Sequence, residues 1–199
     1  FFADMIDGKL GCEFISDEIP PVIFYDPTKF IVTQTGNKIN RKSNLSGLER
    51  ILVAGKTIIE EGTTIRGDFA TISIGQFCVI CENTVLQPGE QEFKGKIAYV
   101  PMQIGDYTII EKDSKVEAAS IGSYVHIGKN CVIGRRCVML DCSVLTEGSV
   151  LSPGAVVPPF SVFSGDPAEF VEKLPVCFAE ECKDHSRDYY NNFRKKEPS

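Results

Sequence analysis

Three groups of residues in this sequence have types and spacings that suit chemistry. The triplet RGD at residues 66–68 is read by extracellular adhesion receptors, although its two charges can also pair with each other. Cys78 and Cys81 have the Cys-x-x-Cys spacing of redox pairs and of half a zinc site. The two histidines, His126 and His185, are candidate general bases. What these residues can do depends on the elements that position them.

An aliphatic residue recurs every six residues through most of the chain, and a small residue follows each one after four positions. The aliphatic series is Val53, Ile59, Ile65, Ile74, Ile80, Leu86, Ile104, Ile110, Val116, Ile121, Ile127, Ile133, Met139, Leu145, Leu151, Val157 and Phe163. The small series is Thr57, Thr63, Cys78, Thr84, Thr108, Ser114, Cys131, Cys137, Ser143, Ser149, Ala155 and Ser161.

This double periodicity resembles the hexapeptide repeat of left-handed parallel β-helices, in which three hexads form one triangular coil. The aliphatic side chains are expected to point inward and stack, and the small residues to fill the corners, where larger side chains would clash. The sequence therefore predicts an all-β solenoid, a left-handed parallel β-helix of hexapeptide repeats with a C-terminal α-helix.

The repeat also divides the chain. We expect an N-terminal arm or cap over residues 1–34, the β-helix over residues 35–165, and a C-terminal helical segment packed on it over residues 166–199. A loop at 87–103, rich in Pro and Gly, interrupts the repeat. Asp166 and Pro167 predict a helix start, because Asp is a good N-cap and Pro suits the first helical position.

Composition excludes some classes of function. The net charge of −6 argues against nucleic-acid binding, and no apolar run is long enough to predict membrane insertion. The first residues, FFADMIDGKLGCEF, make a poor signal peptide, which favours a reducing compartment, the cytoplasm, for this sequence with eight cysteines. Cys78 falls in the small inward column and Cys81 in a turn, so neither is predicted to bind metal or to do redox chemistry.

The stretch TIRGDFATISIG at residues 64–75 resembles the corresponding coil of the γ-class carbonic anhydrases. The resemblance implies an ion pair between Arg66 and Asp68 at a coil corner, and three histidine ligands for zinc. The positions of those ligands hold Gln87, Lys112 and Glu117, which cannot replace three imidazoles. No metal site is therefore predicted, and the same ion pair argues against the adhesion motif, which needs a protruding loop.

The stretch FSGDPA at residues 163–168 resembles the closing turn of the hexapeptide acyltransferases, which contacts their cofactor. Those enzymes need a histidine general base beside an acidic group. His126 has no acidic neighbour in sequence, and His185 lies in the C-terminal helical stretch. We expect no catalytic residue and no cofactor, but a β-helical enzyme, of the carbonic anhydrase or acyltransferase type, remains the alternative.

The run GSYVHIGKNCVIGRRC at residues 122–137, the RGD coil, and the run VVPPFSVFSG at residues 156–165 resemble the dynactin subunit 5 family, whose members are small β-helical proteins. This resemblance implies a non-catalytic structural and adaptor subunit of the pointed-end complex of dynactin. The implied partners are a related β-helical subunit (dynactin subunit 6), the end-capping actin-related protein, other dynactin subunits and dynein cargo adaptors. The implied location is the cytoplasm and the cytoskeleton.

Four residues at outward or corner positions are candidates for partner contacts. Arg135 and Arg136 form a basic pair in an acidic chain, although a solvated turn explains them equally well. Phe69 and Phe77 lie at or near coil corners and suit an apolar contact.

Overall fold

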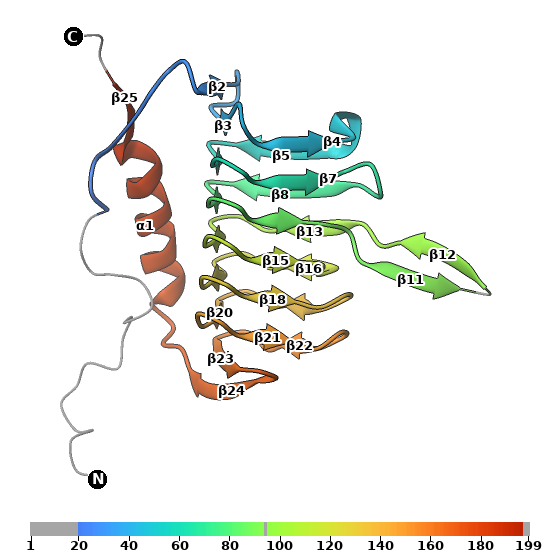
Figure 1. Ribbon diagram of the computed structural model, residues 1–199. Helices are drawn as coiled ribbons and strands as arrows, with labels where there is room; N and C mark the ends of the chain where they lie inside the picture. Colours follow the sequence, from blue (N-terminus) through green and yellow to red (C-terminus); the bar gives the residue numbers. More distant parts are fainter. Residues whose placement is uncertain (1–19, 94, 197–199) are drawn as a thin grey trace, which may run out of the picture.

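The computed structural model describes residues 20–93 and 95–196. Three parallel sheets form the faces of a left-handed β-helix, and the α-helix runs alongside one face (Figure 1). The fold class predicted from the hexapeptide repeat is therefore confirmed. Two of the sheets contain six strands each, so the solenoid has six full coils.

Each sheet collects one strand from every coil. Sheet I contains, in spatial order, β2 (Phe30–Val32), β3 (Lys38–Asn40), β6 (Ile58–Ile59), β9 (Val79–Ile80), β14 (Ile109–Ile110), β17 (His126–Ile127), β20 (Ser143–Leu145), β23 (Ser161–Gly165) and β24 (Ala168–Lys173). Sheet II contains β4 (Asn44–Ser46), β7 (Thr64–Arg66), β10 (Val85–Leu86), β15 (Lys115–Val116), β18 (Val132–Ile133) and β21 (Val150–Leu151). Sheet III contains β5 (Ile51–Gly55), β8 (Ile72–Gln76), β13 (Met102–Ile104), β16 (Ser120–Ile121), β19 (Val138–Met139) and β22 (Val156–Val157).

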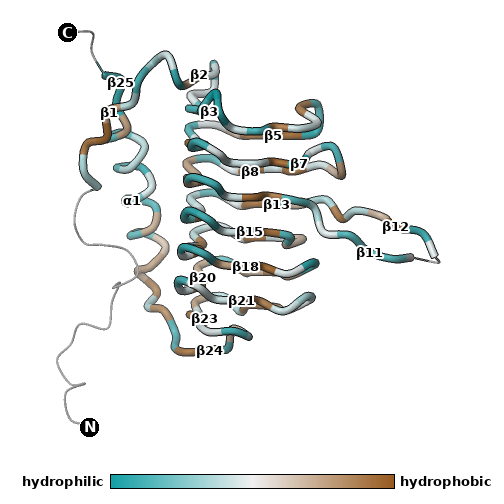
Figure 2. The backbone as a smooth tube through the Cα atoms, in the orientation of Figure 1, coloured by the Kyte–Doolittle hydropathy of each residue, from teal (hydrophilic) through white to brown (hydrophobic). Residues whose placement is uncertain are grey.

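The core is the stack of inward aliphatic residues that the six-residue period predicts. Apolar positions recur from coil to coil along the strands (Figure 2). Every member of the aliphatic series is buried except Val53 and Phe163, which are half-buried at the two ends of the stack. Ile110 and Ile127, on neighbouring strands of sheet I, show the stacking, because they lie opposite each other in register.

The residues of the small series, which form a column at the corners of the coils, also make hydrogen bonds between coils. Thr108 Oγ1 donates to the Gly122 carbonyl at 2.9 Å, and Ser114 Oγ donates to the Gly128 carbonyl at 2.9 Å, in each case one coil further on. The Cys78 thiol makes the equivalent contact with the Gly105 carbonyl at 3.1 Å. The column therefore selects small side chains that donate a hydrogen bond, which accounts for its Thr, Ser and Cys residues.

Helix α1 (Phe178–Asn192) covers sheet I. Phe178 and Cys182 are buried in a second apolar cluster with Val144 and Val162 of that sheet. After the helix, β25 (Phe193–Lys195) pairs in parallel with β1 (Ile23–Tyr25), so the two described ends of the chain lie side by side. None of the described helices is long and apolar enough to cross a membrane.

The helix predicted to begin at Asp166 does not form, and that prediction is wrong. Asp166 and Pro167 form the turn between β23 and β24, which pair as an antiparallel hairpin. Gly165 precedes the turn with a φ of 103°, a conformation that favours glycine and lets the chain reverse. Phe170 then packs against Phe163 with ring centroids 6.1 Å apart, so the reversed strand covers the end of the core.

Candidate protein-binding site

The largest departure from the prism is a hairpin that projects between sheets II and III (Figure 1). It consists of β11 (Glu90–Phe93) and β12 (Lys96–Tyr99), paired antiparallel with each other and with no other described strand. The chain leaves the coil after β10 and rejoins it at β13, so the hairpin occupies the loop expected at 87–103. A rigid body with one protruding ribbon is a geometry that suits protein binding.

One side of the hairpin base is held by charges. The Arg135 guanidinium contacts the Glu90 carboxylate, and its Nε lies 3.6 Å from Glu117 Oε2. Lys115 Nζ lies 2.7 Å from the other oxygen of Glu117. Arg135, predicted as a partner contact, therefore anchors the hairpin to the next coils. Arg136 is exposed, and no ion pair joins it to another residue in the described ranges.

The other side of the base is held by stacked rings. Phe69 stacks on Tyr99 of β12 with ring centroids 4.5 Å apart, and the Arg66 guanidinium lies 4.2 Å from the centre of the Phe69 ring. Arg66 also makes a two-pronged contact with Asp68, with both N–O distances 2.9 Å. This hydrogen bonding lowers the pKa of Asp68. The RGD coil thus braces the root of the hairpin.

Phe77 lies at a different corner, beneath helix α1. Its ring stacks on Tyr107 at 5.4 Å, and Tyr107 stacks in turn on Tyr124 at 5.4 Å. Tyr190 of the helix meets the Phe77 ring edge-on at 5.8 Å, and the Arg187 guanidinium lies 5.9 Å from its centre. The structure therefore places this candidate contact against the protein's own helix.

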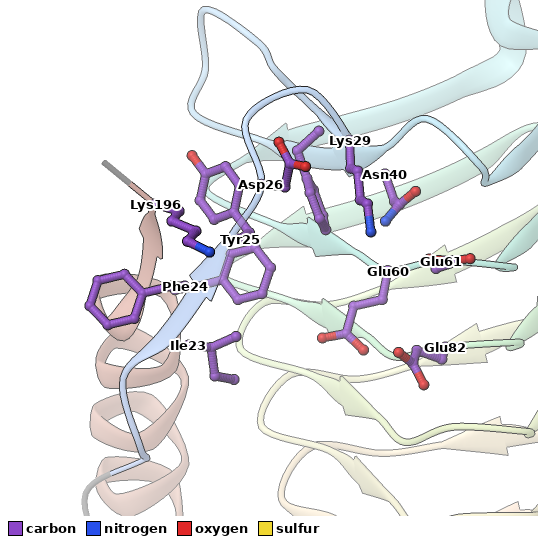
Figure 3. Close-up of a pocket in the computed structure, with 12 residues that line it drawn as sticks. Ile23, Phe24, Tyr25, Asp26, Lys29, Asn40, Glu60, Glu61, Glu82 and Lys196 are labelled. Atoms are coloured by element: carbon purple, nitrogen blue, oxygen red, sulfur yellow. The ribbon is translucent and has the colours of Figure 1, made fainter. Parts of the chain in front are cut away.

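A pocket of about 470 Å³ opens where the two described ends of the chain meet the first coils (Figure 3). Aromatic residues of β1 and β25 form one side, and the carboxylates of Glu60 and Glu82 point in from the other. Burial raises the pKa of Glu60, whose Oε1 accepts a hydrogen bond from the Tyr189 hydroxyl at 3.0 Å. Sequence reasoning missed this pocket, because its lining combines both described ends of the chain with residues of the first coils.

The three positions at which the resemblance implies zinc ligands fall at two corners of the prism. Gln87 and Glu117 follow β10 and β15, which pair in sheet II, so they lie in adjacent coils. Lys112 is exposed and belongs to the corner that follows sheet I. Residues 20–93 and 95–196 contain no group of three His, Cys, Asp or Glu side chains that could hold a metal ion.

His126 has an acidic neighbour that sequence reasoning missed. Its Nε2 lies 2.8 Å from Glu111 Oε1, and this hydrogen bond lowers the pKa of Glu111. His126 sits opposite Ile109 in register, so counting one coil back along the repeat would have located Glu111. The other ring nitrogen, Nδ1, is buried and meets no hydrogen-bonding partner among the described residues. One nitrogen of His126 is therefore engaged with Glu111, and the other is unpartnered but shielded from solvent.

The Cys-x-x-Cys pair also lacks the features of a reactive site. Burial raises the pKa of the Cys78 thiol to about 12 and holds that of Cys81 well above its usual value. Because the thiolate is the reactive form, both thiols are poor nucleophiles and poor metal ligands at neutral pH.

Comparison with known proteins gives one family and one fold. The family model for dynactin subunit 5 matches residues 20–197. A dynactin subunit 5 from Dictyostelium discoideum is 46% identical over 176 residues, which cover 88% of this chain and 89% of that protein.

Solved structures with a similar fold include the N-acyltransferase AntD from Bacillus cereus, in complex with dTDP and 3-hydroxybutyryl-CoA. It has a TM-score of 0.61 and 13% identity, and the match covers 78% of this chain and 88% of AntD. Its S84T mutant, in complex with dTDP and coenzyme A, has a TM-score of 0.60 and 14% identity over 72% of this chain and 83% of that one. At this identity the likeness concerns the fold alone. The family match and the close relative show that this chain belongs to the dynactin subunit 5 family.

Proposed function

We propose that this chain is a non-catalytic structural and adaptor subunit in the pointed-end complex of dynactin. In this role it pairs with the related β-helical subunit, dynactin subunit 6, contacts the end-capping actin-related protein, and supports attachment of dynein cargo in the cytoplasm. The observation that carries the proposal is the 46% identity to a dynactin subunit 5 along 88% of the chain.

The geometry is compatible with a scaffold. Stacked coils with a continuous core form a stiff body, and such bodies present flat faces and ends to their partners. The hairpin β11–β12 adds a ribbon that Arg135 and Phe69 hold in place, and we propose that these two residues support partner binding by fixing it. Arg136, exposed beside it, is the proposed direct contact.

A non-catalytic role is supported by His126. A general base must reach the proton that it removes, but one nitrogen of this histidine is bonded to Glu111 and the other is buried. The acyltransferases of similar fold share too little sequence with this chain to carry their activity over to it.

Affinity purification tests the proposal. The tagged wild-type chain, expressed in cells, should recover the other dynactin subunits in stoichiometric amounts. Arg136→Glu should reduce that recovery, whereas Lys112→Glu, which reverses an exposed charge at a different corner, should not. Recovery of no dynactin subunit by the wild-type chain would overturn the proposal, and equal recovery by all three forms would remove Arg136 from the contact.

A further inference from the structure

The three sheets end differently at the N-terminal end of the solenoid. Sheet I is closed by β2, which pairs antiparallel with β3 and places Ile31 opposite Ile39. Sheets II and III end at β4 and β5, and no strand within the described ranges pairs with the outer edge of either. Two of the three faces therefore end in an open strand edge.

The register shows which backbone groups lie on the open edge of sheet III. The side chains of Gln103 and Ser120 point outward and lie in register on neighbouring strands, in what we call the outward column of sheet III. Both residues donate their N–H groups to the following coil. Leu52 occupies the same column, opposite Ser73. Because alternate residues of a parallel strand direct their backbone groups to opposite neighbours, Val53 directs its N–H and C=O toward the open end.

The edge of sheet II has the same arrangement. Asn44 donates its N–H to the Thr63 carbonyl, in the next coil. Leu45 therefore directs its N–H and C=O away from that coil, toward the open end. Unpaired strand edges of this kind are templates for pairing with another chain.

The end between these edges is apolar. Four side chains that pack on the core are only partly buried there: Ile39, Leu45, Ile51 and Val53. Two further leucines, Leu48 and Leu52, flank them, and these residues are 65% and 56% exposed. The end thus combines hydrogen-bonding edges with an uncovered cross-section of the core.

The C-terminal end is protected against such pairing. Leu140 donates its N–H to the Val157 carbonyl, and one coil later the equivalent position is Pro158, which has no N–H to offer. Sheet I is closed there by β24, which carries Glu169, Glu172 and Lys173. Proline and charge on an edge are devices that prevent association. Sheets II and III also end there in strands that pair with no further described strand, β21 and β22, so the protection consists of the missing N–H of Pro158 and the charges of β24. A second copy of this chain that continued sheet III from its own C-terminal end would therefore lack one of the edge hydrogen bonds.

We propose that the N-terminal end of the solenoid, formed by the edges of β4 and β5 and the apolar residues between them, docks the end coil of a different β-solenoid. A single extended peptide would pair with one edge and leave the other edge and the apolar cross-section in water. A coil presents two strands at the correct angle together with its own inward aliphatic residues. This inference rests on the proposed function, in which the related β-helical subunit of dynactin is the partner.

The test compares charged substitutions at the two ends. The double variant Leu48→Asp, Leu52→Lys places charges on the proposed surface, at positions exposed enough to leave folding intact. The matched control is Val156→Lys, because Val156 occupies the same outward column of sheet III at the protected end and is 59% exposed. Each tagged chain is co-expressed with the related β-helical subunit, and melting curves verify that all three forms fold.

We expect the double variant to recover about tenfold less of the β-helical partner than wild type, and the control to recover as much as wild type. Backbone amide exchange gives a second readout, because the N–H groups of Leu45 and Val53 should exchange fast in the isolated chain and slowly in the pair. The docking surface would be overturned if all three forms recovered equal amounts of the β-helical partner, or if both amides exchanged at the same rate in the isolated chain and in the pair. The proposed function would still stand in that case, provided that the wild-type chain recovered dynactin subunits. Failure of wild type to recover any dynactin subunit would overturn the proposed function itself.

Discussion

Arg66 illustrates how a residue that suggests recognition can be occupied within its own fold. Its guanidinium is shared between the Asp68 carboxylate and the face of the Phe69 ring, and Phe69 in turn stacks on Tyr99. An adhesion receptor needs both charges of the triplet free on a protruding loop. Here the two charges satisfy each other, and the Phe69 ring against the guanidinium belongs to the support of the hairpin.

His185 is the residue at which pH should act on stability. Burial lowers its pKa, and the charge of nearby His126 lowers it further, against a small opposing effect of Asp188. At pH 8 the side chain is neutral in the folded and unfolded states. As the pH falls below about 6.5, the unfolded chain binds a proton that the folded chain resists, so the free energy of unfolding should decrease.

Chemical denaturation at pH 8 and pH 5.5 measures this effect. His185→Gln should lose less stability than wild type between the two pH values, because glutamine does not titrate. An identical pH dependence in both proteins would show that His185 is not the responsible group.

The hairpin β11–β12 is held in place by side chains outside it, among them Phe69, which stacks on Tyr99. Arg66→Ala removes the cation over Phe69 and the partner of Asp68, so the stack that holds Tyr99 should loosen. We expect trypsin to cleave after Lys96, in the hairpin, faster than in wild type. Arg41→Ala, a loss of charge at an exposed position far along the chain, is the control and should leave the rate unchanged. Equal cleavage rates in wild type and Arg66→Ala would contradict the bracing role.

Helix α1 is fastened at its end by a buried lysine. Lys38 Nζ donates to the Tyr190 carbonyl at 3.0 Å and to the Phe193 carbonyl at 2.6 Å, and it lies 3.9 Å from the centre of the Tyr190 ring. Burial lowers its pKa to about 8. The end of a helix leaves carbonyls without partners, and a cation there satisfies them.

Lys38→Met should therefore weaken the docking of the helix. The two carbonyls would lose a charged donor, and we expect the free energy of unfolding to decrease by about 1.5–3 kcal/mol. Lys42→Met, which removes an exposed lysine from an ion pair with Glu61, should cause no measurable change. Equal unfolding midpoints for the two variants in urea would contradict this account.

At the scale of the whole molecule, the free energy of unfolding depends on the stack of inward side chains. Ile110 is fully buried in the middle of the core, so Ile110→Ala should decrease the free energy of unfolding by about 2–5 kcal/mol. Val132→Ala, on an outward and exposed position of β18, should change it by less than about 0.5 kcal/mol. Comparable losses in the two variants, measured by urea denaturation, would contradict the assignment of inward and outward columns.

The two ends of the stack differ in a way that fits a body built for one-sided assembly. Sheets II and III end at both ends in strands that pair with no further described strand, but at the C-terminal end Pro158 offers no N–H and β24 carries charges, whereas β4 and β5 keep all their backbone donors. Stacked solenoids need a cap at each end or a partner that acts as one. The net charge of −6 keeps copies of the chain apart, which favours a partner of different sequence.

The sequence by itself determined the coil, because the requirement for one inward aliphatic and one small residue per hexad is local and repeats along the chain. The same local rule assigned Cys78 to the core. The prediction of no zinc site had a different source, the residue types at Gln87, Lys112 and Glu117, where the resemblance to the γ-class carbonic anhydrases implies three histidines. The capping preferences used at Asp166 failed, because Asp-Pro suits both a helix start and a tight turn. The turn forms there because β24 pairs with the edge of β23 and covers the end of the core.

Only the tertiary structure decided which outward residues meet. Stacking brings residues of successive coils into contact, and a loop of any length can intervene between them. For that reason Glu111 reaches His126, Glu90 reaches Arg135, and Tyr99 reaches Phe69, although none of these pairs is adjacent in sequence. Outward side chains carry no periodic requirement, so their partners follow from the path of the chain in space.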